Sequence, residues 1–238
     1  MKNQNACEPK QRISSPRKGR RHSCREQACM IVWVSFTKGE GVSGEYVMTS
    51  ETHPIYADFV PEERTKVPGR LGMTFAPGMK TRGMRGRWNR DLETDLRVLR
   101  EEYGADVLVS VMEEHEYQGY KIPELFERDL LAGIEVLRFA IEDMNVPKEA
   151  GAEEYEGLIR NIVDRMREGK NVVVHCRGGL GRTGTVAACV LVVLGYHSAD
   201  EAIDAVRAAR RGTVQTRNQE DFVRRFEETH RGRDGGNP

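Results

Sequence analysis

The sequence predicts an α/β fold, built as a single domain with a mostly parallel central sheet flanked by helices. Three observations lead to this expectation. Short apolar runs that suit buried strands alternate with amphipathic segments of helical period through much of the chain. Residues 172–174 are three consecutive valines, as expected of a strand covered on both faces. Residues 183–194 are apolar on nearly every side, which suits a helix in the core.

The chain divides by composition into an extension, a domain and a tail. Basic residues crowd into positions 10–25 without apolar periodicity, so we expect residues 1–47 to be a disordered basic extension. A nuclear-localisation or nucleic-acid patch is the alternative for this run. We place the folded domain at 48–230 and a disordered tail at 231–238. The net charge of the whole chain is zero, which gives no indication of a polyanionic partner.

The domain is expected to begin with an extended, proline-containing lead-in at 52–70. An edge strand is predicted at 71–76, and the Gly- and Arg-rich segment 79–88 is interpreted as a loop. The α/β alternation follows. Strands are predicted at 105–112, 134–141 and 172–174, and helices at 91–103, 123–131, 155–166, 182–194, 198–211 and 216–226.

Capping signals support the last two helices, since Ser198 precedes Glu201 and Thr216 precedes Gln219 with capping-box spacing. In parallel sheets of this kind, ligands lie beyond the carboxyl ends of the strands. The loop that leaves the valine strand and the loop at 142–147 both start at that end. We therefore expect them to contribute to one site.

The loop after the valine strand carries the chemistry. Cys176 precedes Arg182 with five residues between them, and the intervening glycines let backbone N–H groups turn toward an anion at a helix N-terminus. Such a setting favours the thiolate form of a cysteine. The guanidinium of Arg182 can hold two phosphoryl oxygens. A nucleophile and a phosphate clamp on one loop predict a cysteinyl-phosphate intermediate, with Thr183 donating to the departing sulfur and His175 orienting the loop from behind.

Residues 175–184, His-Cys-Arg-Gly-Gly-Leu-Gly-Arg-Thr-Gly, resemble the signature of the cysteine-based protein tyrosine and dual-specificity phosphatases. Together with Val-Gln-Thr at 214–216 and Gln219, they are most similar to the kinase-associated phosphatase branch. The resemblance covers roughly 71–228. It implies a protein tyrosine phosphatase-like fold and hydrolysis of phosphomonoesters without metal or cofactor. The phosphate-binding residues that it implies are Arg177, Gly178, Gly179, Leu180, Gly181 and Arg182.

Two further catalytic residues are expected outside this loop. Asp143, a few residues before a proline, is the candidate general acid for the leaving oxygen, and Glu142 is the fallback. A turn aspartate that binds its own backbone is the other interpretation of Asp143. Gln215 resembles the glutamine that positions the hydrolytic water in related phosphatases. Gln219 stays ambiguous, because its capping-box role already explains it.

The favoured function is a protein tyrosine or dual-specificity phosphatase acting on a phosphorylated protein or peptide. A phosphoinositide phosphatase, a rhodanese-like sulfurtransferase and a non-catalytic phospho-binding module remain as alternatives. A lipid phosphatase of this superfamily often has two basic loop positions, and here only Arg177 is basic while Leu180 occupies the other. The odd count of five cysteines, without framework spacing, indicates a reducing compartment. We therefore expect a cytoplasmic monomer, with neither nucleic acid nor membrane as a partner.

Overall fold

The computed structural model describes residues 46–83, 86–125, 133–195 and 198–234, which fall within one compact unit. The predicted extension at 1–47 lies almost wholly outside the described residues. So does most of the helix predicted at 123–131, of which a 3₁₀ turn at Pro123–Leu125 is described.

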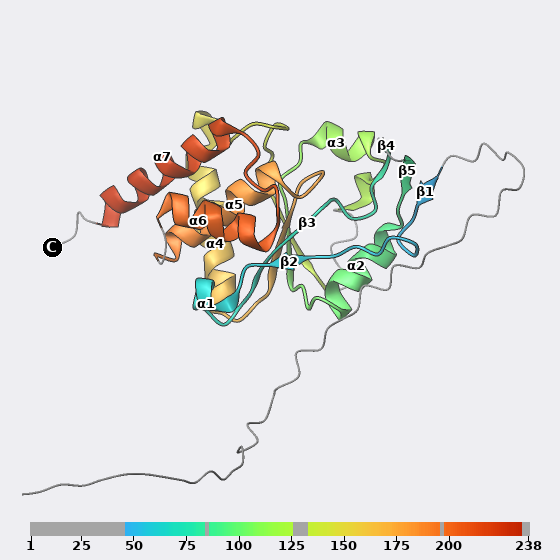
Figure 1. Ribbon diagram of the computed structural model, residues 1–238, viewed down its shortest axis with the longest axis horizontal. Helices are drawn as coiled ribbons and strands as arrows, with labels where there is room; N and C mark the ends of the chain where they lie inside the picture. Colours follow the sequence, from blue (N-terminus) through green and yellow to red (C-terminus); the bar gives the residue numbers. More distant parts are fainter. Residues whose placement is uncertain (1–45, 84–85, 126–132, 196–197, 235–238) are drawn as a thin grey trace, which may run out of the picture. The chain divides into compact units, whose positions relative to one another are not determined.

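The central sheet has five strands in the order β2-β3-β8-β6-β7 (Figure 1). Strands β3, β8, β6 and β7 are parallel to one another, and only the short β2 is antiparallel to its neighbour. The predicted mostly parallel sheet is therefore confirmed. The bounds are β2 Asp58–Phe59, β3 Leu71–Thr74, β6 Val107–Ser110, β7 Glu135–Arg138 and β8 Val172–His175. The strand predicted at 71–76 is confirmed as β3, but its predicted position at the edge of the sheet is wrong, because β2, which lies in the proline-containing lead-in, pairs with the outer side of β3.

A second, three-stranded sheet has the order β1-β5-β4, with β1 at Val47–Met48, β4 at Lys80–Gly83 and β5 at Gly86–Asn89. The loop predicted at 79–88 is therefore wrong, since β4 and β5 pair antiparallel and Thr81 lies opposite Trp88. The Trp88 ring contacts Phe75, with centroids 6.1 Å apart. Burial of this aromatic side chain outweighs the low strand propensity of the surrounding glycines.

Helices lie on both sides of the central sheet, with α4 to α7 on one side and α2 and α3 on the other (Figure 1). The helical bounds are α1 Glu62–Thr65, α2 Leu92–Glu101, α3 Glu114–Gly119, η2 Glu149–Gly151, α4 Ala152–Arg167, α5 Gly181–Val193, α6 Ala199–Ala209 and α7 Arg217–Asp234. The tail predicted from 231 is thus helical in its first four positions. The short α3 was not predicted.

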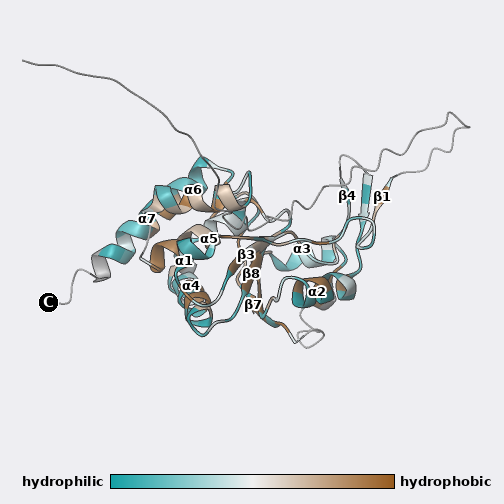
Figure 2. Cartoon of the chain, turned by 60° about the horizontal axis from the view of Figure 1, so that its bottom comes forward, coloured by the Kyte–Doolittle hydropathy of each residue, from teal (hydrophilic) through white to brown (hydrophobic). Residues whose placement is uncertain are grey.

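The core extends from the central strands to α5 on one side and to α2 on the other, and the hydrophobic colour concentrates on the central strands (Figure 2). Val172, Val173 and Val174 are fully buried, and α5 is buried from Gly181 to Val192, as the sequence predicted. Within the described ranges, no helix has the length and apolar character needed to cross a bilayer.

Candidate active site

The Cys176 loop joins the carboxyl end of β8 to the first turn of α5. Its carbonyl groups are held on one side: the Ala76 amide donates to the Arg177 oxygen over 3.1 Å, and Arg210 donates to Gly178 and Gly179 over 3.2 and 2.8 Å. In a trans peptide the N–H points opposite to the C=O. The amides that follow these carbonyls therefore face the other side of the loop, as an anion cradle requires.

Gly179 is needed for this conformation. Its φ is +68°, and an added Cβ would lie 2.0 Å from the carbonyl oxygen of Thr74. A side chain there would have to displace the backbone of β3, so the loop depends on glycine at this position.

Arg182 projects from the start of α5 and is 1% exposed. It donates to both carboxylate oxygens of Glu116 over 2.6 and 2.9 Å, and to the carbonyl of Ile141 over 2.9 Å. Its Nη2 also lies 2.9 Å from Oδ1 of Asp143. Burial alone would lower the pKa of Arg182, but the hydrogen bonds to Glu116 and the surrounding negative charge raise it above its ordinary value. The guanidinium is a permanent, fixed cation.

Glu116 is the functional residue that the sequence analysis missed. It lies on α3, is 5% exposed, and its Oε2 also accepts from the Glu113 amide in a capping box. Burial alone would raise the pKa of Glu116, but the hydrogen bonds from Arg182 and from the Glu113 amide lower it below its ordinary value. The one sequence signal for this helix start is the capping-box spacing of Glu113 and Glu116. This signal is weak, because a capping box usually begins with Ser or Thr rather than Glu.

Asp143 lines a cavity of about 190 Å³ that also contains Cys176, Arg182 and Gln215. Its side chain is 51% exposed, and Oδ1 accepts from the amide of Met144 over 3.0 Å. Asp143 thus makes both of the contacts that the sequence suggested: it binds the backbone of its own turn, and it lies in the site beside Arg182. Glu142 does not line this cavity.

Gln215 reaches the cavity from the turn before α7. The backbone N–H of Gln215 donates to Oε1 of Gln219 over 2.9 Å, while Nε2 of Gln219 donates to the backbone carbonyl of Asn145 over 3.2 Å. Gln219 also forms the predicted capping box, because its amide lies 3.2 Å from Oγ1 of Thr216 and its Oε1 accepts from the Thr216 amide. One buried side chain thus joins the Gln215 turn to the Asp143 loop.

The Gln215 turn is strained at Val214, whose φ is +52°. A β-branched residue rarely adopts this left-handed conformation. Arg207 holds it by donating to the carbonyls of Thr213 and Val214 over 3.2 and 2.8 Å, and it pairs with Glu220 at 2.6 Å. The strain is therefore maintained by contacts from α6 and α7.

Three polar atoms near Cys176 are buried without a hydrogen-bond partner among the described residues: Nε2 of His175, Nε of Arg182 and Oγ1 of Thr183. Nδ1 of His175 lies 3.2 Å from the carbonyl oxygen of Cys176. Burial lowers the pKa of His175 to about 4, so the ring is neutral near pH 7 and this nitrogen donates. Within the described ranges, the Thr183 hydroxyl in the first turn of α5 has no hydrogen-bond partner.

The cavity brings together most residues that the sequence proposed for the site. The proposed residues that line it are Cys176, Arg177, Gly178, Leu180, Gly181, Arg182, Asp143 and Gln215. Gly179 lies in the same loop and Thr183 in the first turn of α5, but neither lines the cavity. Over the described part of the chain, no cluster of three or more His, Cys, Asp or Glu side chains could hold a metal ion.

A parallel α/β sheet with a Cys-x5-Arg loop at the end of a central strand defines a class, the cysteine-based phosphatases. Comparisons with known proteins agree. A family model described as "Polymorphic toxin system, DSP-PTPase phosphatase" matches residues 79–196. Cyclin-dependent kinase inhibitor 3 of Rattus norvegicus is 28% identical over 186 residues, which are 77% of this chain and 84% of that protein.

Two solved structures give the same answer. Kinase-associated phosphatase with its catalytic cysteine changed to serine superimposes with a TM-score of 0.66 at 26% identity, covering 75% of this chain and 97% of that one. The active form of Tk-PTP gives a TM-score of 0.55 at 30% identity, covering 72% and 96%. The chain belongs to the cysteine-based protein tyrosine and dual-specificity phosphatase superfamily, near kinase-associated phosphatase, and is a cysteine-dependent phosphatase.

Proposed function

We propose that this phosphatase hydrolyses phosphomonoesters of phosphorylated proteins or peptides through a cysteinyl-phosphate intermediate, with Cys176 as nucleophile. The observation that carries this proposal is the joint position of Cys176, Arg182 and Asp143 around one cavity of about 190 Å³ at the start of α5. A thiolate, a fixed cation and a proton donor are the groups that phosphoryl transfer to cysteine requires.

In the first step, the thiolate of Cys176 attacks phosphorus while the bond to the ester oxygen breaks. Arg182 and the loop amides hold the non-reacting oxygens. Asp143, protonated, donates its proton to the leaving oxygen, which departs as an alcohol. In this structure Oδ1 of Asp143 lies 2.9 Å from Nη2 of Arg182. The incoming phosphate dianion therefore replaces Asp143 as the partner of Nη2, and the carboxyl group becomes free to reach the leaving oxygen.

In the second step, water attacks the phosphocysteine and the sulfur–phosphorus bond breaks. Asp143, now ionised, accepts the proton of the water, and Gln215, which lines the same cavity, orients that water. The hydroxyl of Thr183 donates to the departing thiolate. Support for this role comes from its buried oxygen, which has no other partner among the described residues. Inorganic phosphate and the free thiolate are the products.

His175 and Glu116 act as positioning residues. The neutral imidazole of His175 donates to the Cys176 carbonyl and orients the peptide that carries the nucleophile. Glu116 fixes the plane of the Arg182 guanidinium through two hydrogen bonds, so the clamp is in place before phosphate binds.

A phosphorylated protein or peptide is the proposed substrate, in a reducing compartment such as the cytoplasm. Support comes from the relatives, which include a kinase-associated phosphatase. The chemistry favours the compartment, because a nucleophilic thiolate loses activity on oxidation and recovers it on reduction by thiols.

The test is turnover of p-nitrophenyl phosphate by the wild type, Cys176→Ser and the matched control Cys189→Ser. Cys189 is a second buried cysteine, on α5, and it does not line the catalytic cavity. We expect Cys176→Ser alone to abolish turnover, and rapid quenching of the wild type to trap phosphate on Cys176. Loss of a catalytic nucleophile usually lowers the rate by far more than about tenfold. Activity of Cys176→Ser above about a tenth of the wild-type value would therefore refute the covalent mechanism.

A further inference from the structure

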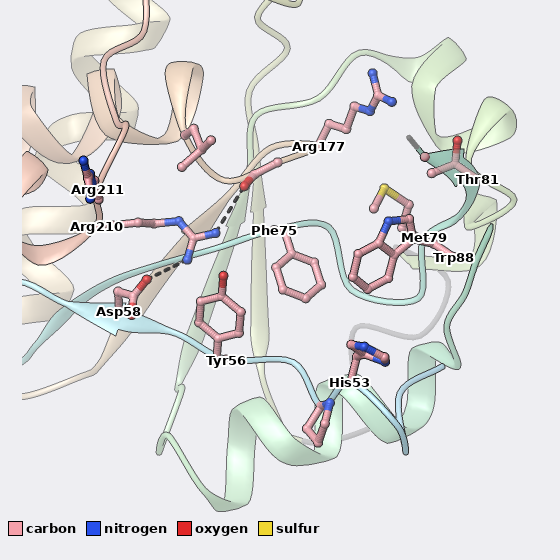
Figure 3. Close-up of a pocket in the computed structure, with 14 residues that line it drawn as sticks. His53, Tyr56, Asp58, Phe75, Met79, Thr81, Trp88, Arg177, Arg210 and Arg211 are labelled. Atoms are coloured by element: carbon pink, nitrogen blue, oxygen red, sulfur yellow. Dashed lines mark hydrogen bonds and ion pairs between the residues drawn. The ribbon is translucent and has the colours of Figure 1, made fainter. Parts of the chain in front are cut away.

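A larger cavity, of about 750 Å³, adjoins the catalytic cavity at the Cys176 loop, and Figure 3 shows the residues that line it. Arg177, Gly178 and Leu180 line both cavities. We call the larger one the aromatic groove, after the aromatic rings of His53, Tyr56, Phe75 and Trp88 that line it. It is not used by the catalytic steps described above.

The four rings form a continuous row along the groove. Tyr56 and Phe75 have centroids 5.6 Å apart, Phe75 and Trp88 6.1 Å, and His53 and Trp88 6.0 Å. Tyr56 is 46% exposed, and Figure 3 shows its ring beside Phe75 in the groove. Such a surface suits an aromatic or large apolar side chain, because aromatic rings favour edge-to-face and offset contacts with one another.

A buried ion pair supports the row from behind. The Arg90 guanidinium lies 4.9 Å from the centre of the Phe75 ring and 5.7 Å from that of Trp88. It is neutralised by Asp95 through contacts of 2.7 and 2.8 Å, and it donates to the His53 carbonyl over 2.7 Å. The groove is therefore built on fixed contacts.

The charge of the groove is positive. Its lining contains Arg177, Arg210, Arg211 and one carboxylate, Asp58. Asp58 is neutralised by Arg210 at 2.7 Å, and the other nitrogens of Arg210 donate to the carbonyls of the Cys176 loop. Arg177 and Arg211 are exposed cations on opposite sides of the row of rings (Figure 3), and of the two only Arg177 also lines the catalytic cavity. An anionic group beside an apolar one would satisfy both features.

We propose that the aromatic groove binds the peptide segment adjoining the phosphorylated residue, and that it selects an aromatic side chain next to a carboxylate. Two observations favour a peptide. The groove continues directly from the catalytic cavity, and its cations lie next to a row of rings that a free phosphate would not use. The inference rests on the proposed function, since it assumes that a phosphopeptide occupies the catalytic cavity.

The test measures peptide affinity in the Cys176→Ser background, where binding does not depend on turnover. The probes are phosphotyrosine peptides that carry Phe-Glu, Phe-Lys or Ala-Glu on either side of the phosphotyrosine. We expect Phe-Glu to bind about tenfold more tightly than Phe-Lys, which is 1.4 kcal/mol. Adding Arg211→Glu should reverse that preference, and adding Tyr56→Ala should remove the preference for Phe over Ala.

Arg97→Glu is the matched control, because Arg97 is an equally exposed arginine on α2 that does not line the groove. It should leave the order of the three peptides unchanged. Equal binding of all three peptides, or the same result for Arg211→Glu and Arg97→Glu, would overturn the proposal. The proposal would also be overturned if Arg211→Glu and Tyr56→Ala weakened the binding of a soluble phosphoinositide but left the binding of the peptides unchanged. Turnover of p-nitrophenyl phosphate by the chain with Cys176 intact reports separately on the proposed function.

Discussion

Replacing Glu116 by glutamine tests how far Arg182, the proposed phosphate clamp, depends on its buried partner. Glu116 and Arg182 are 5% and 1% exposed, and two hydrogen bonds of 2.6 and 2.9 Å join them. Glutamine keeps the shape but removes the charge and one acceptor. Removing one partner of a buried pair costs about 3–5 kcal/mol, and here Arg182 would keep, among the described residues, only the half-exposed carboxylate of Asp143 as a charge partner. For a domain of this size we expect the thermal midpoint to fall by roughly 6–20 °C.

The matched control is Glu114→Gln, which makes the same chemical change two residues earlier on α3. Glu114 pairs with Arg138, but its side chain is 74% exposed. An exposed pair contributes about 0–1 kcal/mol, so this variant should unfold close to the wild type. Urea unfolding monitored by circular dichroism gives both free energies of unfolding. If the two variants lose the same stability, burial is not what makes the Glu116–Arg182 pair important.

Three further predictions concern single residues of the site. Asp143→Asn should lower the rate on phosphotyrosine peptides by about 10²–10⁴-fold more than on p-nitrophenyl phosphate, whose leaving group needs less protonation; a selective loss in Glu142→Gln instead would transfer the acid role to Glu142. Gln215→Ala should slow hydrolysis of the phosphocysteine, so that stopped-flow traces show a burst of p-nitrophenolate followed by slow turnover, and an unchanged trace would contradict its role. Stability should fall by up to about 3 kcal/mol as the pH drops from 6.5 toward 4, because unfolded His175 takes up a proton that its buried ring, with a pKa of about 4, does not. Urea titrations should show a flatter pH dependence for His175→Gln over this range, and an identical slope would contradict the assignment.

The parts of the site that the sequence predicted are those encoded locally. Cys176 and Arg182 stand on one loop between a valine strand and an apolar helix, so their spacing and their context lie in one stretch of the chain. The capping boxes at Ser198 and Thr216 likewise span four residues each. Patterns of this length determine local structure with little help from the rest of the fold.

The parts that were missed depend on contacts between distant segments. Glu116 lies 66 residues from Arg182 in sequence, on a helix of six residues that is too short to show helical periodicity. Arg210 and Asp58 are 152 residues apart. The hairpin of β4 and β5 is stabilised through Trp88, whose partner Phe75 belongs to another segment. No local pattern carries these pairings, so they became visible only with the fold.

The double use of Gln219 limits which substitutions the chain can accept during evolution. Its side chain accepts from the Gln215 amide and donates to the Asn145 carbonyl, and it is fully buried. Glutamate at this position would lose the donor, leucine would lose both contacts, and asparagine would be one carbon too short to span them. Any lineage that changed this residue would have to rebuild the Asp143 loop and the Gln215 turn together. A helix cap thus couples the proposed general acid, Asp143, to the proposed water-positioning residue, Gln215.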